Sequence, residues 1–129
     1  MRIGQAAEAA GMTTKALRFY EERGLLPSPG RSANGYREYG ESAVDRLGFI
    51  RRARTAGLSL AQIGQILAVR DHGQATCAHV VDLLAAQLAA LDAQIAELGA
   101  LRESVSESFR AAAAGDPSAC DPDSVCSYL

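Results

Sequence analysis

The chain of 129 residues has few of the residue types and motifs that enzyme active sites depend on. It contains only two histidines, His72 and His79, and it lacks both a Ser/His/Asp set and a glycine-rich phosphate-binding loop. These absences make an enzyme the least favoured functional class, and we expect a protein that binds rather than catalyses.

Cysteines are also few, and their number is odd. The three of them, Cys77, Cys120 and Cys126, cannot form a closed disulfide framework within one chain. No run of residues approaches the ~20 apolar residues of a membrane span, and the opening Met1-Arg2-Ile3 is not typical of a signal peptide. We therefore expect a cytoplasmic protein without a membrane partner, whose thiols stay reduced and available to a metal.

Charge is divided unevenly along the chain. Residues 1–70 carry eleven Lys and Arg against six Asp and Glu, whereas residues 71–129 carry two against nine. The two parts therefore have net charges of +5 and −7, behind an overall charge of only −2. A basic N-terminal part is what a nucleic-acid-binding protein needs, although a solvated surface with uneven charge would give the same balance.

The N-terminal residues have the pattern of two short helices joined by a glycine-containing turn. Apolar residues recur at helical spacing in residues 3–10 and again in residues 13–23, with Gly11 between them. The second helix of such a helix-turn-helix can enter the major groove of DNA. Its side chains suited to phosphates and base edges, which are our predicted DNA contacts, are Thr13, Thr14, Lys15, Arg18 and Tyr20.

The segment that follows, residues 25–39, cannot be helical because it contains two prolines and a Pro-Gly step. Asn34-Gly35 is a strong hairpin signal, and a hairpin placed directly after a helix-turn-helix is a wing. We predict that its side chains Arg31, Tyr36 and Arg37 contact the DNA backbone. The alternative is an ordinary surface loop whose tyrosines pack on the domain.

Two further helices are predicted over residues 41–56 and 59–69, followed by one long helix over residues 76–114. The long helix carries apolar residues at alternating spacings of four and three, the pattern of a coiled coil. We call this row the heptad stripe: Cys77, Val81, Leu84, Leu88, Leu91, Ile95, Leu98, Arg102, Val105 and Phe109. A stripe of this length needs a partner helix, and a second copy of the same chain is the simplest one.

Cysteines lie at both ends of this long helix. Cys77 falls in its first turn, where the positive end of the helix dipole favours the thiolate. Cys120 and Cys126 follow its C-terminus, in a short tail. If two long helices pair in antiparallel fashion, each Cys77 lies beside the partner's tail, and a dimer holds two shared sites.

Four segments resemble the MerR family of bacterial transcription regulators: residues 3–7 (IGQAA), 13–26 (TTKALRFYEERGLL), 34–39 (NGYREY) and 57–60 (GLSL). The resemblance covers essentially residues 1–114. It implies a mainly α fold with a winged helix-turn-helix domain and an antiparallel coiled-coil helix that forms a homodimer. It also implies double-stranded promoter DNA and RNA polymerase as partners, with activation by distortion of a promoter whose two recognition elements are spaced too far apart.

A cysteine at the start of the long helix and cysteines in the tail are similar to the metal-responsive branch of this family. We therefore predict a metal site made by Cys77 of one chain with Cys120 and Cys126 of the other. Three thiolates favour a divalent thiophilic ion, namely Hg, Cd, Pb or Zn. His79, Asp121 or Asp123 could add a fourth ligand. The tail pair is displaced, because the chain has alanines at residues 111–114, where typical metal sensors of this branch place a ligand cysteine.

Three other readings of the cysteines stay open. The chain could be a thiol-based redox-sensing regulator without metal, a copper(I) sensor that uses only Cys120 and Cys126, or a DNA-binding dimer with incidental cysteines. In the related copper sensors the position of Cys77 resembles a serine that is not a ligand. The predicted domains are residues 1–73 (winged helix-turn-helix domain with connector helices), 74–114 (dimerisation helix) and 115–129 (metal-binding tail).

Overall fold

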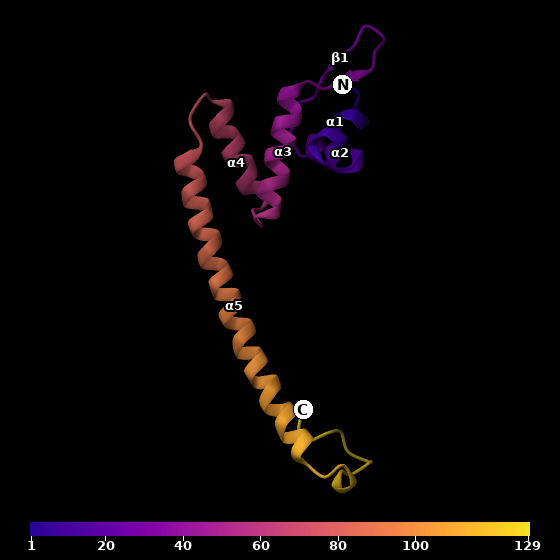
Figure 1. Cartoon of the computed structure of the whole chain (residues 1–129), viewed down its shortest axis with the longest axis vertical. Helices are drawn as coiled ribbons and strands as arrows, with labels where there is room; N and C mark the ends of the chain where they lie inside the picture. Colours follow the sequence, from indigo (N-terminus) through magenta and orange to yellow (C-terminus); the bar gives the residue numbers. More distant parts are fainter. The chain divides into compact units, whose positions relative to one another are not determined.

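The structure, a computed structural model, describes all 129 residues, and the protein is mainly α, as predicted (Figure 1). In chain order the elements are α1 (Ile3–Ala10), α2 (Thr14–Glu22), β1 (Gly30–Arg31), β2 (Arg37–Glu38), α3 (Glu41–Thr55), α4 (Leu60–Asp71), α5 (Cys77–Ala114) and the short 3-10 helix η1 (Pro117–Ala119). Every helix predicted from the sequence is present, with ends that differ by one or two residues.

The helix-turn-helix is made by α1 and α2. Gly11 ends α1 in the left-handed conformation, with φ of 72°, which an L side chain rarely adopts. Thr13 then caps α2, because its hydroxyl oxygen accepts a hydrogen bond from the backbone N–H of Ala16 at 3.1 Å. These two local signals determine where the first helix ends and the second begins.

The predicted wing is present as a short antiparallel hairpin. Gly30 pairs with Glu38 and Arg31 pairs with Arg37. The connection is a three-residue loop rather than a two-residue turn: the Ser32 N–H donates to the Tyr36 carbonyl at 2.7 Å, and Gly35 has φ of 81°. A loop of this kind places a glycine in the left-handed position after a type I turn, which explains the role of Gly35.

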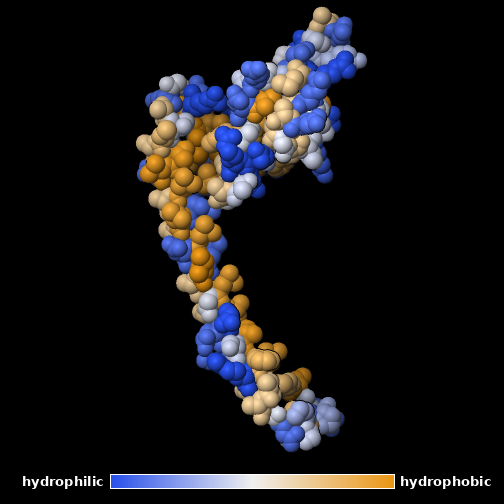
Figure 2. Space-filling view, in the orientation of Figure 1, coloured by the Kyte–Doolittle hydropathy of each residue, from blue (hydrophilic) through white to orange (hydrophobic).

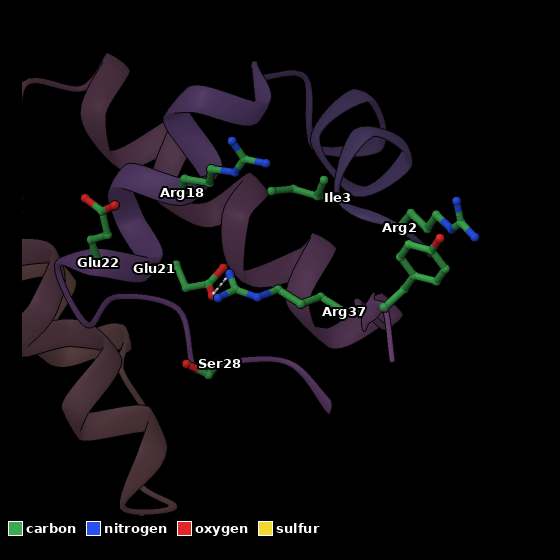
Figure 3. Close-up of a pocket in the computed structure, with 8 residues that line it drawn as sticks. Arg2, Ile3, Arg18, Glu21, Glu22, Ser28 and Arg37 are labelled. Carbon is green, nitrogen blue, oxygen red and sulfur yellow. Dashed lines mark hydrogen bonds and ion pairs between the residues drawn. The ribbon is translucent and has the colours of Figure 1, made fainter. Parts of the chain in front are cut away.

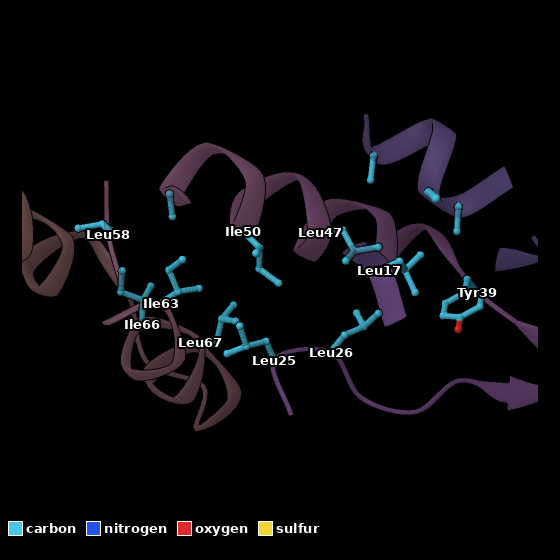
Figure 4. Packing of buried hydrophobic residues seen from close by; sticks show 14 residues of the cluster. Leu17, Leu25, Leu26, Tyr39, Leu47, Ile50, Leu58, Ile63, Ile66 and Leu67 are labelled. Atoms are coloured by element: carbon cyan, nitrogen blue, oxygen red, sulfur yellow. The ribbon is translucent and has the colours of Figure 1, made fainter. Parts of the chain in front are cut away.

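The hydrophobic core lies among α1 to α4 and the residues that follow α2 (Figure 4). Its largest fully buried side chains are Tyr39, Leu17, Leu47, Ile50 and Ile63. The buried residues of α1 are all alanines (Ala6, Ala7 and Ala10), so this helix packs close to its neighbours through small side chains. The core thereby holds α2 and the base of the wing on one framework.

Arg46 of α3 ties together three parts of this domain. Its guanidinium donates to the Leu25 carbonyl at 2.6 Å and makes two hydrogen bonds, of 2.7 and 3.1 Å, to the carboxylate of Asp71 at the end of α4. The hydrogen bond from Arg46 is the main reason that the pKa of Asp71 is lowered. Arg46 is therefore engaged within the fold.

The first turns of α5 pack on this domain. Val80 and Leu83 contact the core, and the Gln87 side chain donates to the Ala56 carbonyl at 3.2 Å. Gly57 has φ of 84°, which an L side chain rarely adopts, and a Cβ there would have to displace the end of the Gln87 side chain. The compact unit that contains the core accordingly spans Met1–Gln87, and Leu88–Leu129 form a second unit.

The rest of α5 leaves its apolar side chains in solvent. No residue of α5 is buried, and the heptad stripe is exposed from Val81 to Phe109 in the single chain. Figure 2 shows apolar side chains along the length of this helix. A row of this extent on one helix indicates a surface that another chain covers.

By length and composition, α5 is also apolar enough to cross a membrane. A single helix of this kind is weak evidence of a span. The helix passes this test through its many alanines, while Asp82, Gln87 and Asp92 interrupt it, so no run of ~20 consecutive apolar residues exists.

Candidate DNA interface and cysteine sites

Helix α2 presents three of its predicted DNA-contacting residues on the side away from the core, whereas the fourth, Tyr20, packs against the core. Leu17 is buried and Tyr20 is half-buried against the core, which leaves Thr14, Lys15 and Arg18 exposed. Thr13 is exposed as well; its hydroxyl accepts the capping hydrogen bond, and its O–H remains free to donate.

A cavity of about 640 Å³ lies between α2 and the wing (Figure 3). It brings together predicted DNA-contacting residues from separate segments, since Arg18 of α2 and Arg37 of β2 both line it. Arg2 lines it too, with its guanidinium 4.0 Å from the centre of the Tyr36 ring. The other lining residues are Ile3, Glu21, Glu22, Ser28 and Tyr36. Arg2 is a basic residue of this surface that the sequence analysis missed, because its sequence position before α1 gives no sign of proximity to the wing.

Arg37 is held by an acidic partner on α2. Its Nη1 lies 2.7 Å from Oε1 of Glu21, and the Tyr39 hydroxyl donates to the other carboxylate oxygen at 2.7 Å. The Glu21 side chain is only 8% exposed, whereas that of Arg37 is 48% exposed. Burial, and then the hydrogen bond with Glu21, raise the pKa of Tyr39. Glu21 is the second residue that sequence reasoning missed, since the pairing depends on how the hairpin docks on α2.

The remaining wing residues lie on the surface. Arg31 is exposed and donates to the Gly35 carbonyl at 2.9 Å, within its own hairpin, and Tyr36 is half exposed beneath Arg2. Lys15 and Arg18 have no ion-pair partner in the chain. The α2 and wing surface therefore carries unpaired cations and hydroxyl groups, the groups that bind a phosphate backbone.

All three cysteines are free and exposed. Cys77 is the first residue of α5, and Cys120 and Cys126 line one cavity of about 350 Å³ in the tail, together with Asp116, Asp121 and Tyr128. Within the single chain no three His, Cys, Asp or Glu side chains are placed to hold a metal ion. Accessible thiols are suitable donors for a thiophilic ion.

The three residues considered as a fourth ligand differ in their surroundings. Both carboxylate oxygens of Asp121 accept hydrogen bonds in the tail, from the Asp123 N–H at 2.9 Å and the Ser124 hydroxyl at 3.1 Å. Nε2 of His79 is buried and has no hydrogen-bond partner. The side chain of Asp123 is exposed. Asp121 is therefore the one residue of the three whose potential ligand atoms already accept hydrogen bonds within the fold.

The helix-turn-helix, the wing and the basic cavity between them define a winged helix DNA-binding protein. The family model of the MerR helix-turn-helix regulatory proteins matches residues 1–69, and that of the MerR DNA-binding region matches residues 44–107. The chain belongs to the MerR family of transcriptional regulators, as the resemblance implied.

Three similar proteins illustrate this membership. A protein of Haemophilus influenzae described as a probable heavy metal-dependent transcriptional regulator is 46% identical over 98 residues, 76% of this chain and 77% of that protein. The regulator PbrR691 of Ralstonia metallidurans CH34, solved in complex with lead(II), has a TM-score of 0.80 and 37% identity over 93% of this chain and 94% of its own. HiNmlR, a family member lacking the sensor domain and solved bound to promoter DNA, has a TM-score of 0.60 and 27% identity over 85% of this chain and 83% of its own.

Proposed function

We propose that this protein is a metal-responsive transcriptional activator. It binds an inverted-repeat promoter operator as a homodimer, and a thiophilic divalent ion held by its cysteines triggers distortion of the DNA, so that RNA polymerase can engage both promoter elements. The observation that carries this proposal is the placement of the thiols: Cys120 and Cys126 line one cavity, and Cys77 begins the helix that carries the heptad stripe.

The DNA-binding half of the proposal rests on the surface formed by α2 and the wing. The exposed Lys15 and Arg18 supply unpaired positive charge, and Arg31 and Arg37 extend it onto the hairpin. In a dimer this surface occurs twice, related by a two-fold axis, and this symmetry is the reason to expect an inverted repeat. The working location of such a regulator is the cytoplasm.

The dimer half of the proposal rests on the exposed heptad stripe. Pairing two α5 helices would remove Leu88, Leu91 and Ile95 from water in each chain. An antiparallel arrangement would place each Cys77 near the partner's tail, and each dimer would then hold two sites with three thiols apiece.

The chemistry of the donors supports a soft, divalent ion. Three thiolates bind Hg, Cd, Pb or Zn in preference to hard ions. The bound ion would supply a link between the first turn of one α5 and the tail of the other chain. Around a divalent ion the site keeps one fewer negative charge than around copper(I), which makes it easier to bury. A copper(I) site built from Cys120 and Cys126 alone is the second candidate, because these two thiols already share a cavity.

Metal quantitation on protein purified under reducing conditions tests the proposal, together with a competition series of ions. We expect a stoichiometric divalent ion in the wild type. A redox-sensing regulator would hold none. The variant Cys77→Ser should lose the response to divalent ions and keep operator binding. If Cys77→Ser still activates with every divalent ion, the three-thiolate site is wrong and the tail pair acts alone.

A further inference from the structure

Two carboxylates line the cavity between α2 and the wing, and their surroundings differ. Glu22 is exposed, whereas the Glu21 side chain is 8% exposed and accepts hydrogen bonds from both Arg37 and Tyr39. If both were simply negative charges near the DNA backbone, removing either would strengthen binding. The hydrogen bonds of Glu21 give a reason to expect the opposite for that residue.

We infer that Glu21 is a positioning residue for DNA binding, which orients the Arg37 guanidinium toward the phosphate backbone and couples the wing to α2. The inference rests on the proposed DNA-binding function and adds a role for one carboxylate in it. It concerns a residue that lies beneath the DNA-facing surface and acts through another side chain.

The geometry supports this role in two ways. The ion pair uses Nη1 of Arg37 and leaves the N–H groups of Nε and Nη2 without a partner in the chain. The Tyr39 hydroxyl occupies the second oxygen of Glu21, and because Tyr39 is almost fully buried it holds that carboxylate in place from within the domain. Arg37 sits on a strand of only two residues, so without this anchor its long side chain would have to be ordered when DNA binds.

The test is a double-mutant cycle of Glu21→Gln and Arg37→Ala, with Glu22→Gln as the matched control. The probe is a duplex enriched from a random-sequence library on the wild-type protein, and the readouts are the dissociation constant and its salt dependence. We expect Glu21→Gln to weaken binding by about three- to tenfold and Glu22→Gln to leave it equal or slightly stronger. In the Arg37→Ala background, Glu21→Gln should have little further effect, because its role passes through Arg37.

The outcomes separate a positioning role from a structural one. The inference is overturned if Glu21→Gln binds as tightly as the wild type. It is also overturned if Glu21→Gln weakens binding by the same factor in the Arg37→Ala background as in the wild type. Arg37→Lys provides a second variant if Glu21→Gln does not fold: it keeps the charge but loses the planar fork, so we expect weaker binding with an unchanged salt slope. Wild-type affinity for Arg37→Lys would also overturn the inference. A wild type that enriches no duplex contradicts the proposed function as well.

Discussion

Arginine supplies all but one of the basic side chains of this protein, since Lys15 is the only lysine. Two of these arginines have separate tasks that their charge alone does not reveal. Arg46 has an 11% exposed side chain and joins α3 to α4, whereas Arg37 is half exposed, with most of its donors free. The same residue type therefore stabilises the fold at one position and, at the other, keeps free donors on the surface that we propose binds DNA.

Replacing Arg37 with alanine tests the role of the wing at the residue scale. We expect Arg37→Ala to weaken binding to all duplexes and to lower the slope of log affinity against log salt by about one unit, because one phosphate contact is lost. The measurement is fluorescence anisotropy over a series of salt concentrations. An unchanged slope would show that Arg37 does not contact the backbone.

The Arg46–Asp71 pair gives a pH-dependent contribution to stability. The folded-state pKa of Asp71 lies below its ordinary value of 3.8, because Arg46 hydrogen-bonds the carboxylate. The contribution is therefore present above that value and is lost as the pH falls through the folded-state pKa. We expect Asp71→Asn to lower the free energy of unfolding at pH 7 by less than about 1 kcal/mol, since the carboxylate is half exposed.

Urea unfolding at fixed protein concentration, at pH 7 and at a pH below the folded-state pKa of Asp71, measures this effect. The difference between Asp71→Asn and the wild type should disappear at the lower pH. The control is Asp45→Asn, which removes an exposed carboxylate of α3 that has no ion-pair partner. A difference for Asp71→Asn that persists in acid would mean that the ion pair is not its source.

At the scale of elements, sequence reasoning recovered most of the fold. Gly11, Thr13 and Gly35 are local signals, and the sequence alone determines where they end a helix, cap one or close a hairpin. The heptad stripe is equally visible, because periodicity needs no tertiary information. The pairs Arg37–Glu21 and Arg2–Tyr36 were not predictable, because they arise from the docking of the hairpin and the N-terminal residues against α2, over distances in sequence that no periodic pattern covers.

The role of α5 can be tested with one substitution in its stripe. Leu91 lies in the second compact unit and is exposed in the single chain, so Leu91→Asp should cost the monomer little. In a paired seam the same change buries a carboxylate among apolar side chains, which is costly. We expect a monomeric or unfolded protein that no longer binds the operator, measured by sedimentation velocity and circular dichroism.

Ala93→Asp, off the stripe, is the control and should remain dimeric. A stable Leu91→Asp dimer would show that this stripe is not the interface.

At the scale of the whole molecule, the three cysteines make sense as one site only if two chains contribute. Cys77 begins α5, and Cys120 and Cys126 follow its end, separated by a helix of 38 residues. The single chain brings no three ligating side chains together. In an antiparallel dimer, each Cys77 would lie near the partner's Cys120 and Cys126, at both ends of the helix pair. We therefore predict that dimerisation and metal binding depend on each other.

A mixed dimer tests that dependence directly. One chain carries Cys77→Ser and the other carries Cys120→Ser with Cys126→Ser, and two different affinity tags allow only the mixed species to be purified. If each site takes Cys77 from one chain and the tail from the other, the mixed dimer keeps one complete site, with Cys77 of the tail-deficient chain and the intact tail of its partner. We expect it to retain about half of the chelator-resistant divalent metal of the wild type. The homodimer of Cys77→Ser and the homodimer of Cys120→Ser with Cys126→Ser should each retain none. If instead every site lay within one chain, neither half of the mixed dimer would have three thiols, and its tightly bound metal would be absent.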